Sequence, residues 1–570
     1  MSRLAIYQLF VRHFSNYQQE QTYNGTLQQN GCGTFNGVTE KALEEIQKMG
    51  VSHVWYTGIL EQASLMGYPQ RPADPESIVK GIAGSPYAVR DYYDVCPDYA
   101  SSFASRMEEF EALVTRTHAA GLKCLIDFIP NHVARSYESD VRLEREFAGD
   151  DKSAFYSREN FFYYLEGSGK LTLPDGRGVY GELNSPARVT GNNSATWSPS
   201  SHDWFETVKL NYGYDYRDKS TLAALPSADA GHEEVPKTWN KMYEILHYWA
   251  GKGVDGVRCD MAHMVPVQFW AWVINKIRHD YPEFTFIAEA YAQDPMGCLP
   301  NNDLKDLTDV GFDAYYDQDL YHNLKGAVEY KQPVDSLGYV FFQHDQQSHG
   351  VRYIENHDEV RSSHPHHFGS YQQNLAATAV SWLTGSGPVM LYNGQEVGES
   401  AQGASGYSGD DGRSSIFDYI CLPELQKWTN QGAFDGGGLS HEQRDLRAGV
   451  VNLLRLSNTE PFVSGETFGI NYANEHLRDQ GVFAFMRYSR DLYPKVSLVL
   501  ACLHNHIPAQ ITLRVPRAAL EAAGIEGGKL SALSVNGQRP SGVELNEEGD
   551  ATFSVMLSSA YEIVRLVTVS

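Results

Sequence analysis

Leu125-Ile126-Asp127-Phe128-Ile129-Pro130-Asn131-His132 decides the fold of this 570-residue chain, because here a short apolar run ends in acidic and polar residues. Three later segments repeat the pattern: Gly256-Val257-Arg258-Cys259-Asp260, Phe286-Ile287-Ala288-Glu289 and Tyr353-Ile354-Glu355-Asn356-His357-Asp358. The carboxyl ends of parallel strands meet on one rim of a barrel, where α/β barrels carry their functional residues. We therefore expect these polar side chains to gather on a single rim.

Short apolar runs alternate with helical patterns along most of the chain. The runs that read as strands are 5–10, 51–56, 123–128, 254–258, 285–289, 311–315, 351–355 and 388–392. Apolar residues spaced three and four apart predict helices between them, for example over 40–49, 107–120, 238–250 and 267–279. Gly50 and Gly121 stand where two of these helices should end. The alternation predicts an α/β protein with a (β/α)8 TIM barrel.

Two regions depart from the barrel pattern. The connection between the third strand and the helix near Thr238 runs to roughly a hundred residues, far longer than an ordinary loop. We expect a subdomain inserted after strand 3, over 135–226, and a barrel formed by 1–134 and 227–458. After the last helical pattern, 442–457, residues alternate between apolar and polar over 482–488, 496–503, 509–515 and 551–557. This predicts a C-terminal all-β sandwich over 459–570.

Composition excludes several classes of partner. The formal net charge of −25 argues against nucleic acid and anionic membranes, which both need basic surfaces. No apolar run reaches the roughly 18 residues of a membrane span. The seven cysteines are dispersed and include no CxxC pair, so neither a disulfide framework nor a zinc site is indicated. The first ten residues read as a strand rather than a signal peptide, and we expect a cytoplasmic protein.

The strand-end residues have the types needed to cleave an acetal between sugars. That reaction needs an acid for the leaving oxygen and a carboxylate that attacks the sugar or activates water. Arg258 lies two residues before Asp260 on one strand, so both face the same side and the guanidinium can hold the carboxylate ionised. Glu289 ends an apolar strand and is the candidate acid. A structural ion pair explains Arg258 and Asp260 alone, but the ordered set favours catalysis.

The four segments resemble, in order, the signature regions of the α-amylase family of glycoside hydrolases, glycoside hydrolase family 13. The resemblance extends over the barrel and includes 6–14, 51–59 and 85–95. It implies a (β/α)8 barrel, a domain inserted after the third strand and a C-terminal β-sandwich.

The resemblance also implies roles for single residues. Asp260 matches the nucleophile, Glu289 the acid/base, and Asp358 the third essential carboxylate, which stabilises the transition state. The residues that we assign to substrate binding are Arg258, His132 and His357 at the cleavage subsite, Tyr87 as the aromatic platform, Asp127 at a structural position beside them, and His263 on the acceptor side. Asn131 matches a structural position that is a calcium ligand in many members of the family.

The sequence departs from the family pattern at two places. Many members carry Lys-His three and four residues after the nucleophile, where this chain has His263 and Met264. The sequence therefore leaves two questions open: which residues contact the acceptor, and whether the acceptor is water or a sugar. The stretch Val208-Lys209-Leu210-Asn211-Tyr212 lacks the aspartate of the usual block, so a structural calcium ion stays an open alternative and no cofactor is required.

The expected function is retaining hydrolysis of α-1,4-glucosidic bonds in maltooligosaccharides or starch-like α-glucans. The alternatives are a transglycosylase, such as a maltosyl- or 4-α-glucanotransferase, then a disaccharide isomerase, and last a non-catalytic glycan-binding relative. The expected partner is an α-glucan, with no nucleic acid and no membrane. Chain-length preference, endo or exo action and oligomeric state are left open by the sequence.

Overall fold

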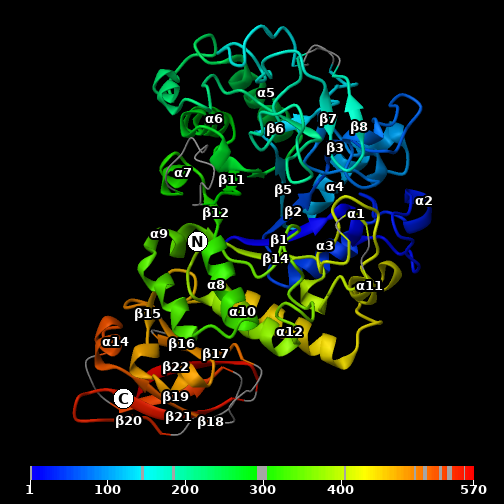
Figure 1. Ribbon diagram of the computed structural model, residues 1–570. Coiled ribbons are helices and arrows are strands. Elements are labelled where there is room, and N and C mark those ends of the chain that lie inside the picture. The colour runs from blue at the N-terminus through cyan, green and yellow to red at the C-terminus, as the bar shows by residue number, and fades with distance from the viewer. Residues whose placement is uncertain are drawn as a thin grey trace.

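The computed structural model describes residues 3–142, 147–182, 186–291, 304–403, 406–407, 409–492, 496–504, 510–525, 529–535, 542–557 and 559–569. A central barrel separates two other parts of the chain (Figure 1). The long connection between the third barrel strand and the next helix lies on one side, and the C-terminal β-strands lie on the other. None of the helices in these residues combines the length and the hydropathy needed to cross a bilayer.

Eight parallel strands form the barrel, and each overlaps one of the eight runs predicted from sequence, although the seventh shares only Val351 with its predicted run. Their sheet order is β13-β12-β11-β10-β5-β2-β1-β14. The ring closes beyond β13, where Arg352 bridges to Val389 in parallel and its N–H donates to the Pro388 carbonyl at 2.7 Å. The strands are β1 (Ala5–Phe10), β2 (His53–Thr57), β5 (Lys123–Phe128), β10 (Gly256–Cys259), β11 (Thr285–Ala288), β12 (Ala314–Tyr316), β13 (Gly350–Val351) and β14 (Val389–Tyr392).

Helices surround this ring. Gly50 and Gly121 have left-handed φ values of 105° and 75° just beyond two of them, as a glycine C-terminal stop requires. The longer helices are α3 (Glu40–Lys48), α4 (Arg106–Ala119), α5 (Lys237–Gly251), α6 (Val267–Asp280), α8 (Gln318–Glu329), α10 (Tyr371–Leu383) and α12 (His441–Ser457). The short ones are α1 (Val11–Phe14), α2 (Leu27–Asn30), α7 (Lys305–Asp309), α9 (His344–His349) and α11 (Pro423–Thr429).

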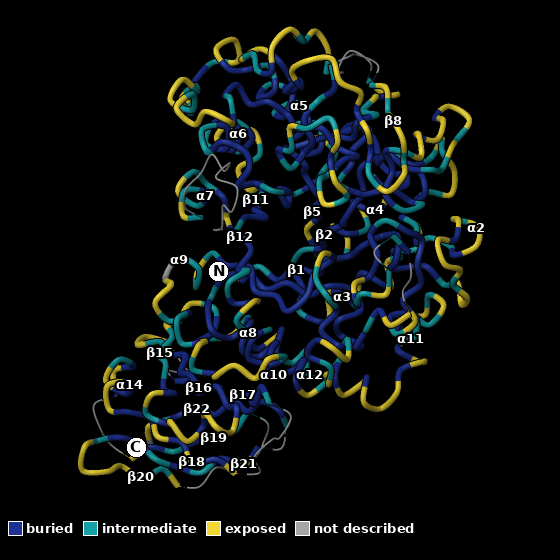
Figure 2. Tube along the Cα trace, viewed as in Figure 1, coloured by how far each residue is buried: buried dark blue, intermediate teal, exposed yellow. Residues whose placement is uncertain are grey.

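The barrel interior is apolar below the rim. Successive strand residues point to opposite faces, so alternate residues of each strand face the axis. One buried cluster there includes Ile6, Trp55, Leu125, Ile287 and Val351. The barrel strands accordingly appear almost wholly buried in Figure 2. This packed apolar layer, called the floor below, lies directly beneath the polar residues at the strand ends.

Small antiparallel pairs build the wall above the rim. After β2 comes the pair β3 (Leu60–Gln62) and β4 (Val89–Val95). After β5 comes β6 (His132–Ala134), which pairs with β9 (Thr207–Lys209). The pair β7 (Leu171–Leu173) and β8 (Gly178–Tyr180) lies between them in sequence. The third-strand connection thus returns to β6 before α5 begins.

The C-terminal strands form two antiparallel sheets around their own core. On β16, Val482, Ala484 and Met486 face that core, whereas Phe483 and Phe485 join the core of the barrel. Phe483 stacks on Phe341 with ring centroids 5.7 Å apart, so the module packs firmly on the barrel. The larger sheet holds β15 (Glu466–Gly469), β16 (Val482–Tyr488), β17 (Val496–Cys502), β22 (Tyr561–Val569) and β19 (Lys529–Ser534). The smaller holds β18 (Gln510–Val515), β21 (Ala551–Met556) and β20 (Glu544–Leu545), and two helices, α13 (His476–Asp479) and α14 (Arg517–Ala522), accompany the sheets.

Candidate active site

Arg258 is the centre of the polar cluster on the barrel rim. Its side chain is buried, and one terminal nitrogen, Nη1, lies 2.8 Å from Asp260 Oδ1 and 3.5 Å from Asp127 Oδ1. The other, Nη2, lies 2.8 Å from Glu289 Oε2. The guanidinium group also lies 5.3 Å from the ring of Trp55 in the floor. One buried cation therefore faces three carboxylates from three neighbouring strands. The contact with Asp260 is a charge-assisted hydrogen bond, whereas the contact with Glu289 is an ion pair without hydrogen-bond geometry.

Asp260 follows directly after β10. Its N–H continues the ladder by donating to the Phe128 carbonyl at 2.8 Å. The next residue, Met261, adopts a left-handed conformation with φ of 46°, which is uncommon outside glycine. This turn aims the Met261 N–H at Glu289 Oε2, 2.9 Å away. A strained residue thus links the two carboxylates through the backbone.

Glu289 follows directly after β11 and is held at both oxygens. Oε2 accepts from Met261 and pairs with Arg258, as above. Oε1 accepts from the hydroxyl of Tyr291 at 2.5 Å. Tyr291 was not singled out from sequence, although its position two residues after Glu289 puts the two side chains on one side of an extended chain.

Asp260 and Glu289 lie against the two terminal nitrogens of the same guanidinium group, so the charge of Glu289 acts on Asp260. Burial, and then the charge of Glu289, raise the pKa of Asp260 well above its ordinary value, while Arg258 opposes the shift. Burial of Asp260 thus opposes its charged form, and the guanidinium group of Arg258 is the contact that favours it.

His357 and Asp358 lie on the opposite side of the rim, after β13. His357 Nε2 lies 3.0 Å from Asp358 Oδ2 and 2.5 Å from the hydroxyl of Tyr87, whose ring stacks on the imidazole. The Asp358 side chain is 47% exposed, so it faces open space above the rim. Desolvation opposes ionisation of Asp358, but His357, and then Arg258 and Arg413, keep its pKa below the ordinary value.

Gln8 holds the other ring nitrogen of His357. Its amide nitrogen lies 2.7 Å from His357 Nδ1 and also donates to Thr57 Oγ1 at 3.1 Å. The imidazole is therefore contacted at both nitrogens, by Gln8 at Nδ1 and by Asp358 and Tyr87 at Nε2. The sequence analysis did not identify Gln8. The signal for it was a polar residue inside the otherwise apolar first strand.

Asp127 lies beneath these residues. Its Oδ2 accepts from the Gly58 N–H at 2.8 Å, and its Oδ1 accepts from the Tyr87 hydroxyl at 3.4 Å. Burial raises the pKa of Asp127, and the positive charge of Arg258 opposes that shift. Asp127 therefore connects the arginine cluster to the Tyr87 side of the rim.

His132 and Asn131 begin the wall after β5. The His132 ring contacts Trp204 at 5.1 Å, and its Nδ1 lies 3.2 Å from the Asn131 amide nitrogen. Burial, and then Lys209, lower the pKa of His132 to about 3, so the imidazole is neutral at ordinary pH.

The residues beside Asn131 do not fit a calcium ion. Asn131 Oδ1 accepts a hydrogen bond from Lys209 Nζ at 2.8 Å. Calcium sites are built from carboxylate and carbonyl oxygens, whereas here an ammonium group already supplies the positive charge at the asparagine oxygen.

His263 lies in a short 3₁₀ turn, Ala262–Met264, just after Asp260. Its ring contacts the Tyr291 ring edge-on at 5.3 Å. The residue at the acceptor position thus packs against the ring of the tyrosine whose hydroxyl donates to Glu289, so it lies next to a residue that holds the candidate acid.

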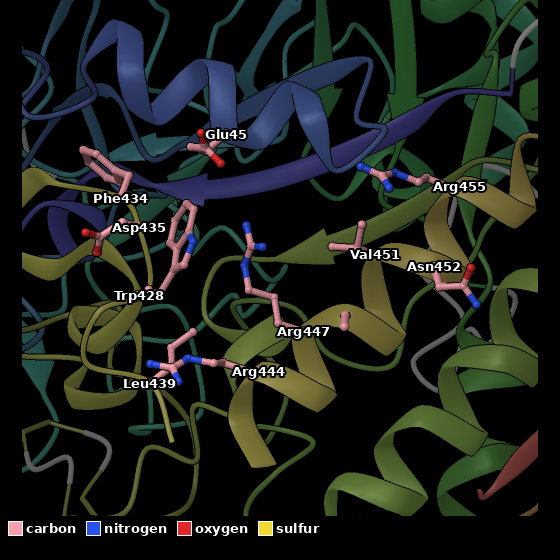
Figure 3. A pocket seen from close by; sticks show the side chains of 12 residues that line it. Glu45, Trp428, Phe434, Asp435, Leu439, Arg444, Arg447, Val451, Asn452 and Arg455 are labelled. Carbon is pink, nitrogen blue, oxygen red and sulfur yellow. The ribbon is translucent and has the colours of Figure 1, made fainter. Parts of the chain in front are cut away.

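A separate pocket lies away from this rim. Its cavity of about 440 Å³ lies between α3 and α12, and its lining includes Trp428, Arg444, Arg447 and Arg455 (Figure 3). Glu45 and Asp435 also face it, so its positive charge is partly balanced. None of the residues identified above lines it.

Fold and site together define a class: a (β/α)8-barrel protein whose carboxyl rim carries the carboxylate arrangement of glycosidases. The family described as alpha amylase, catalytic domain, matches residues 8–416, and the chain belongs to this family.

Curated relatives match the chain at low identity. Maltase A1 of Drosophila melanogaster is 24% identical over 332 residues, which are 58% of this chain and 44% of the relative. Alpha-amylase 3 of Dictyoglomus thermophilum is 22% identical over 408 residues, 69% of this chain and 63% of the relative. The chain thus spans about half of the length of the curated relatives it matches.

Solved structures share the fold over the whole chain. A maltogenic alpha-amylase from Thermotoga neapolitana superposes with a TM-score of 0.60 at 18% identity, covering 100% of this chain and 99% of that one. A debranching enzyme from Nostoc punctiforme gives 0.62 at 15% identity, covering 99% and 98%. At such identities the likeness supports the fold alone.

The low pKa of His132 makes stability depend on pH. Between pH 6.5 and about 3 the unfolded chain binds a proton at this residue that the folded chain does not, so stability is lost as pH falls. At pH 5.0 this loss is about 2 kcal/mol. We expect His132→Gln to show a smaller drop in thermal midpoint between pH 7.5 and pH 5.0 than the wild type. The exposed control His279→Gln should follow the wild type, and an unchanged drop in His132→Gln would contradict the assignment.

Proposed function

We propose that this protein is a retaining glycoside hydrolase that cleaves α-1,4-glucosidic bonds in maltooligosaccharides or starch-like α-glucans. The observation that carries the proposal is the contact of Arg258 with both Asp260 and Glu289, at 2.8 Å each. The two terminal nitrogens of one guanidinium hold the carboxylates close together. This favours the short carboxyl separation of retaining enzymes, which leaves no room for a water molecule between sugar and base.

In the first step Asp260 attacks the anomeric carbon. Its Oδ1 is held by Arg258, whereas Oδ2 has no hydrogen-bond partner among the described residues, so Oδ2 is the oxygen with a lone pair available. A bond forms between this oxygen and the sugar as the bond to the leaving glycosidic oxygen breaks. Glu289 gives its proton to that leaving oxygen, which departs as a free hydroxyl group.

In the second step Glu289 acts as a base. It removes a proton from water, and the water oxygen displaces Asp260 from the anomeric carbon with the configuration retained overall. The Tyr291 hydroxyl at Oε1 can donate to the carboxylate or accept from the carboxyl group, so it can follow both protonation states.

Asp358, His357 and Tyr87 bind the sugar on the donor side. The exposed Asp358 carboxylate offers an acceptor to sugar hydroxyls, and His357 Nε2 lies 3.0 Å from it. The Tyr87 ring, stacked on His357, offers an aromatic face of the kind on which sugars pack. The presence of all three carboxylates argues against a non-catalytic glycan-binding protein.

Transglycosylation is the second candidate function. The residues on the acceptor side of the site support it, because they differ from the usual pair of the family. His263 and Met264 replace the usual pair, and His263 contacts Tyr291 beside the acid. A cyclomaltodextrin glucanotransferase from Geobacillus stearothermophilus is among the relatives, 22% identical over 374 residues. A disaccharide isomerase on the same scaffold is the weaker alternative.

The proposed enzyme requires no cofactor for the reaction, because acid, base and nucleophile are all side chains. We further propose that it acts in the cytoplasm. The six cysteines in the described part of the chain are free thiols, as is usual in a reducing compartment.

Glu289→Gln should lower kcat/KM on maltooligosaccharides by about 10²- to 10⁴-fold, because an amide cannot protonate the leaving oxygen. A donor with a fluoride leaving group needs no such proton, so its first step should be nearly unaffected. The exposed Glu283→Gln is the matched control and should keep wild-type rates. Wild-type turnover of maltooligosaccharides by Glu289→Gln would refute the assignment.

Maltotetraose in oxygen-18 water should separate hydrolysis from transfer. We expect only shorter oligosaccharides, each new reducing end carrying one heavy oxygen, because water attacks the glycosyl-enzyme. Products longer than maltotetraose without the label would instead establish a glucanotransferase. Mass spectrometry of the product ladder reads both outcomes.

A further inference from the structure

Four carboxylates gather away from the catalytic cluster, where the β3–β4 pair meets the start of the third-strand connection. They are Glu61 on β3, Asp91 and Asp94 on β4, and Asp140 in the loop beyond β6. One carboxylate oxygen from each lies within 4.8 Å of the others. The first three side chains are buried, and Asp140 faces solvent.

The arginines nearby do not neutralise this group. Arg71 and Arg90 both contact Glu61 Oε1, at 2.7 Å and 3.0 Å, and both also contact Asp74, which lies outside the group. Arg106 pairs with Asp94 through Nη2, and the same nitrogen lies 4.0 Å from Asp140 Oδ2, so three arginines face the four carboxylates of the group and Asp74. The cations are therefore shared with a further carboxylate.

Asp91 receives only neutral hydrogen bonds among the described residues. Its donors are the Tyr93 N–H at 2.8 Å, the Ser139 hydroxyl at 2.8 Å and the Asp140 N–H at 3.2 Å. A buried carboxylate without a cation is costly unless another positive charge lies beside it.

The second oxygen of Glu61 points to a ligand independently. Glu61 is fully buried, and its Oε2 has no hydrogen-bond partner among the residues that the structure describes. Since both arginines contact Oε1, Oε2 is the oxygen left for another partner. Buried polar atoms without partners are rare in folded proteins and often mark the place of an ion.

We propose that Glu61, Asp91, Asp94 and Asp140 bind a divalent cation, and that this cation is Ca²⁺. All four donors are carboxylate oxygens, the ligands of a hard cation, and no thiol or imidazole belongs to the group. The solvent-facing Asp140 provides an entry path and room for water ligands. Ca²⁺ tolerates the irregular arrangement of such a set better than Mg²⁺, which demands near-octahedral geometry.

The ion would join two parts of the cleft wall. β4 begins two residues after Tyr87, and the Tyr92 hydroxyl on that strand donates to the His132 carbonyl at 3.2 Å. Asp140 belongs to the segment that follows His132. A cation held by both segments therefore fixes the Tyr87 side of the cleft against the His132 side, at a place distinct from Asn131, where Lys209 supplies the charge.

Calorimetric titration of the chelator-treated full-length protein with CaCl₂ tests this site without reference to catalysis. We expect one ion per chain and a rise in thermal midpoint on binding. Asp140→Asn removes a ligand at a solvent-facing position without disturbing the core, and should weaken the affinity on the order of tenfold or more. Asp91→Asn should abolish the rise in midpoint. Glu138→Gln, a 65% exposed neighbour outside the group, is the matched control and should bind like the wild type.

The outcomes are distinct. Loss of affinity in Asp140→Asn and Asp91→Asn with retention in Glu138→Gln supports the site. Wild-type affinity in both ligand variants, or the absence of any Ca²⁺ binding by the wild type, would overturn it. Because ion binding is the readout, neither result depends on the proposed hydrolase activity.

Discussion

The contact of one buried arginine with three carboxylates is the constraint on which the site depends. Arg258 lies between Asp127, Asp260 and Glu289, each from a different strand of the barrel. Without the guanidinium group, three buried negative charges would repel one another in a region of low dielectric. With it, the strands must keep their register, because a shift by one residue would turn each side chain to the other face of the sheet.

The contacts of Arg258 also give Asp260 and Glu289 different surroundings, and therefore different roles in the proposed reaction. Arg258 holds Asp260 by one oxygen and leaves the other for the sugar, while the left-handed turn at Met261 and the Tyr291 hydroxyl hold Glu289. His357 and Asp358 lie across the rim and are oriented by Gln8 and Tyr87 rather than by the arginine. Asp260 and Glu289 are thus arranged around one cation, and His357 and Asp358 are held through Gln8 and Tyr87, whereas the acceptor side depends on the turn with His263.

The sequence predicted the elements and the local geometry well. The eight strands and the pairing of Arg258 with Asp260 follow from short-range periodicity, because residues two apart on a strand share a face. Gln8 was missed because its contact with His357 joins the first and seventh strands, which only barrel closure brings together. Lys209 was noted as a departure from the family pattern, but its contact with Asn131 requires the pairing of β6 with β9. Contacts of this kind depend on tertiary register, which local patterns do not contain.

The central claim is that Asp260 is the nucleophile held by Arg258. Incubation with a fluorinated α-glucosyl fluoride, which forms the glycosyl-enzyme quickly and releases it slowly, should trap that intermediate. Peptide mapping by mass spectrometry then locates the sugar. The account predicts one label per chain, on the carboxylate of Asp260. A label on Glu289 or Asp358, or turnover of the donor with no covalent adduct at any residue, would contradict it.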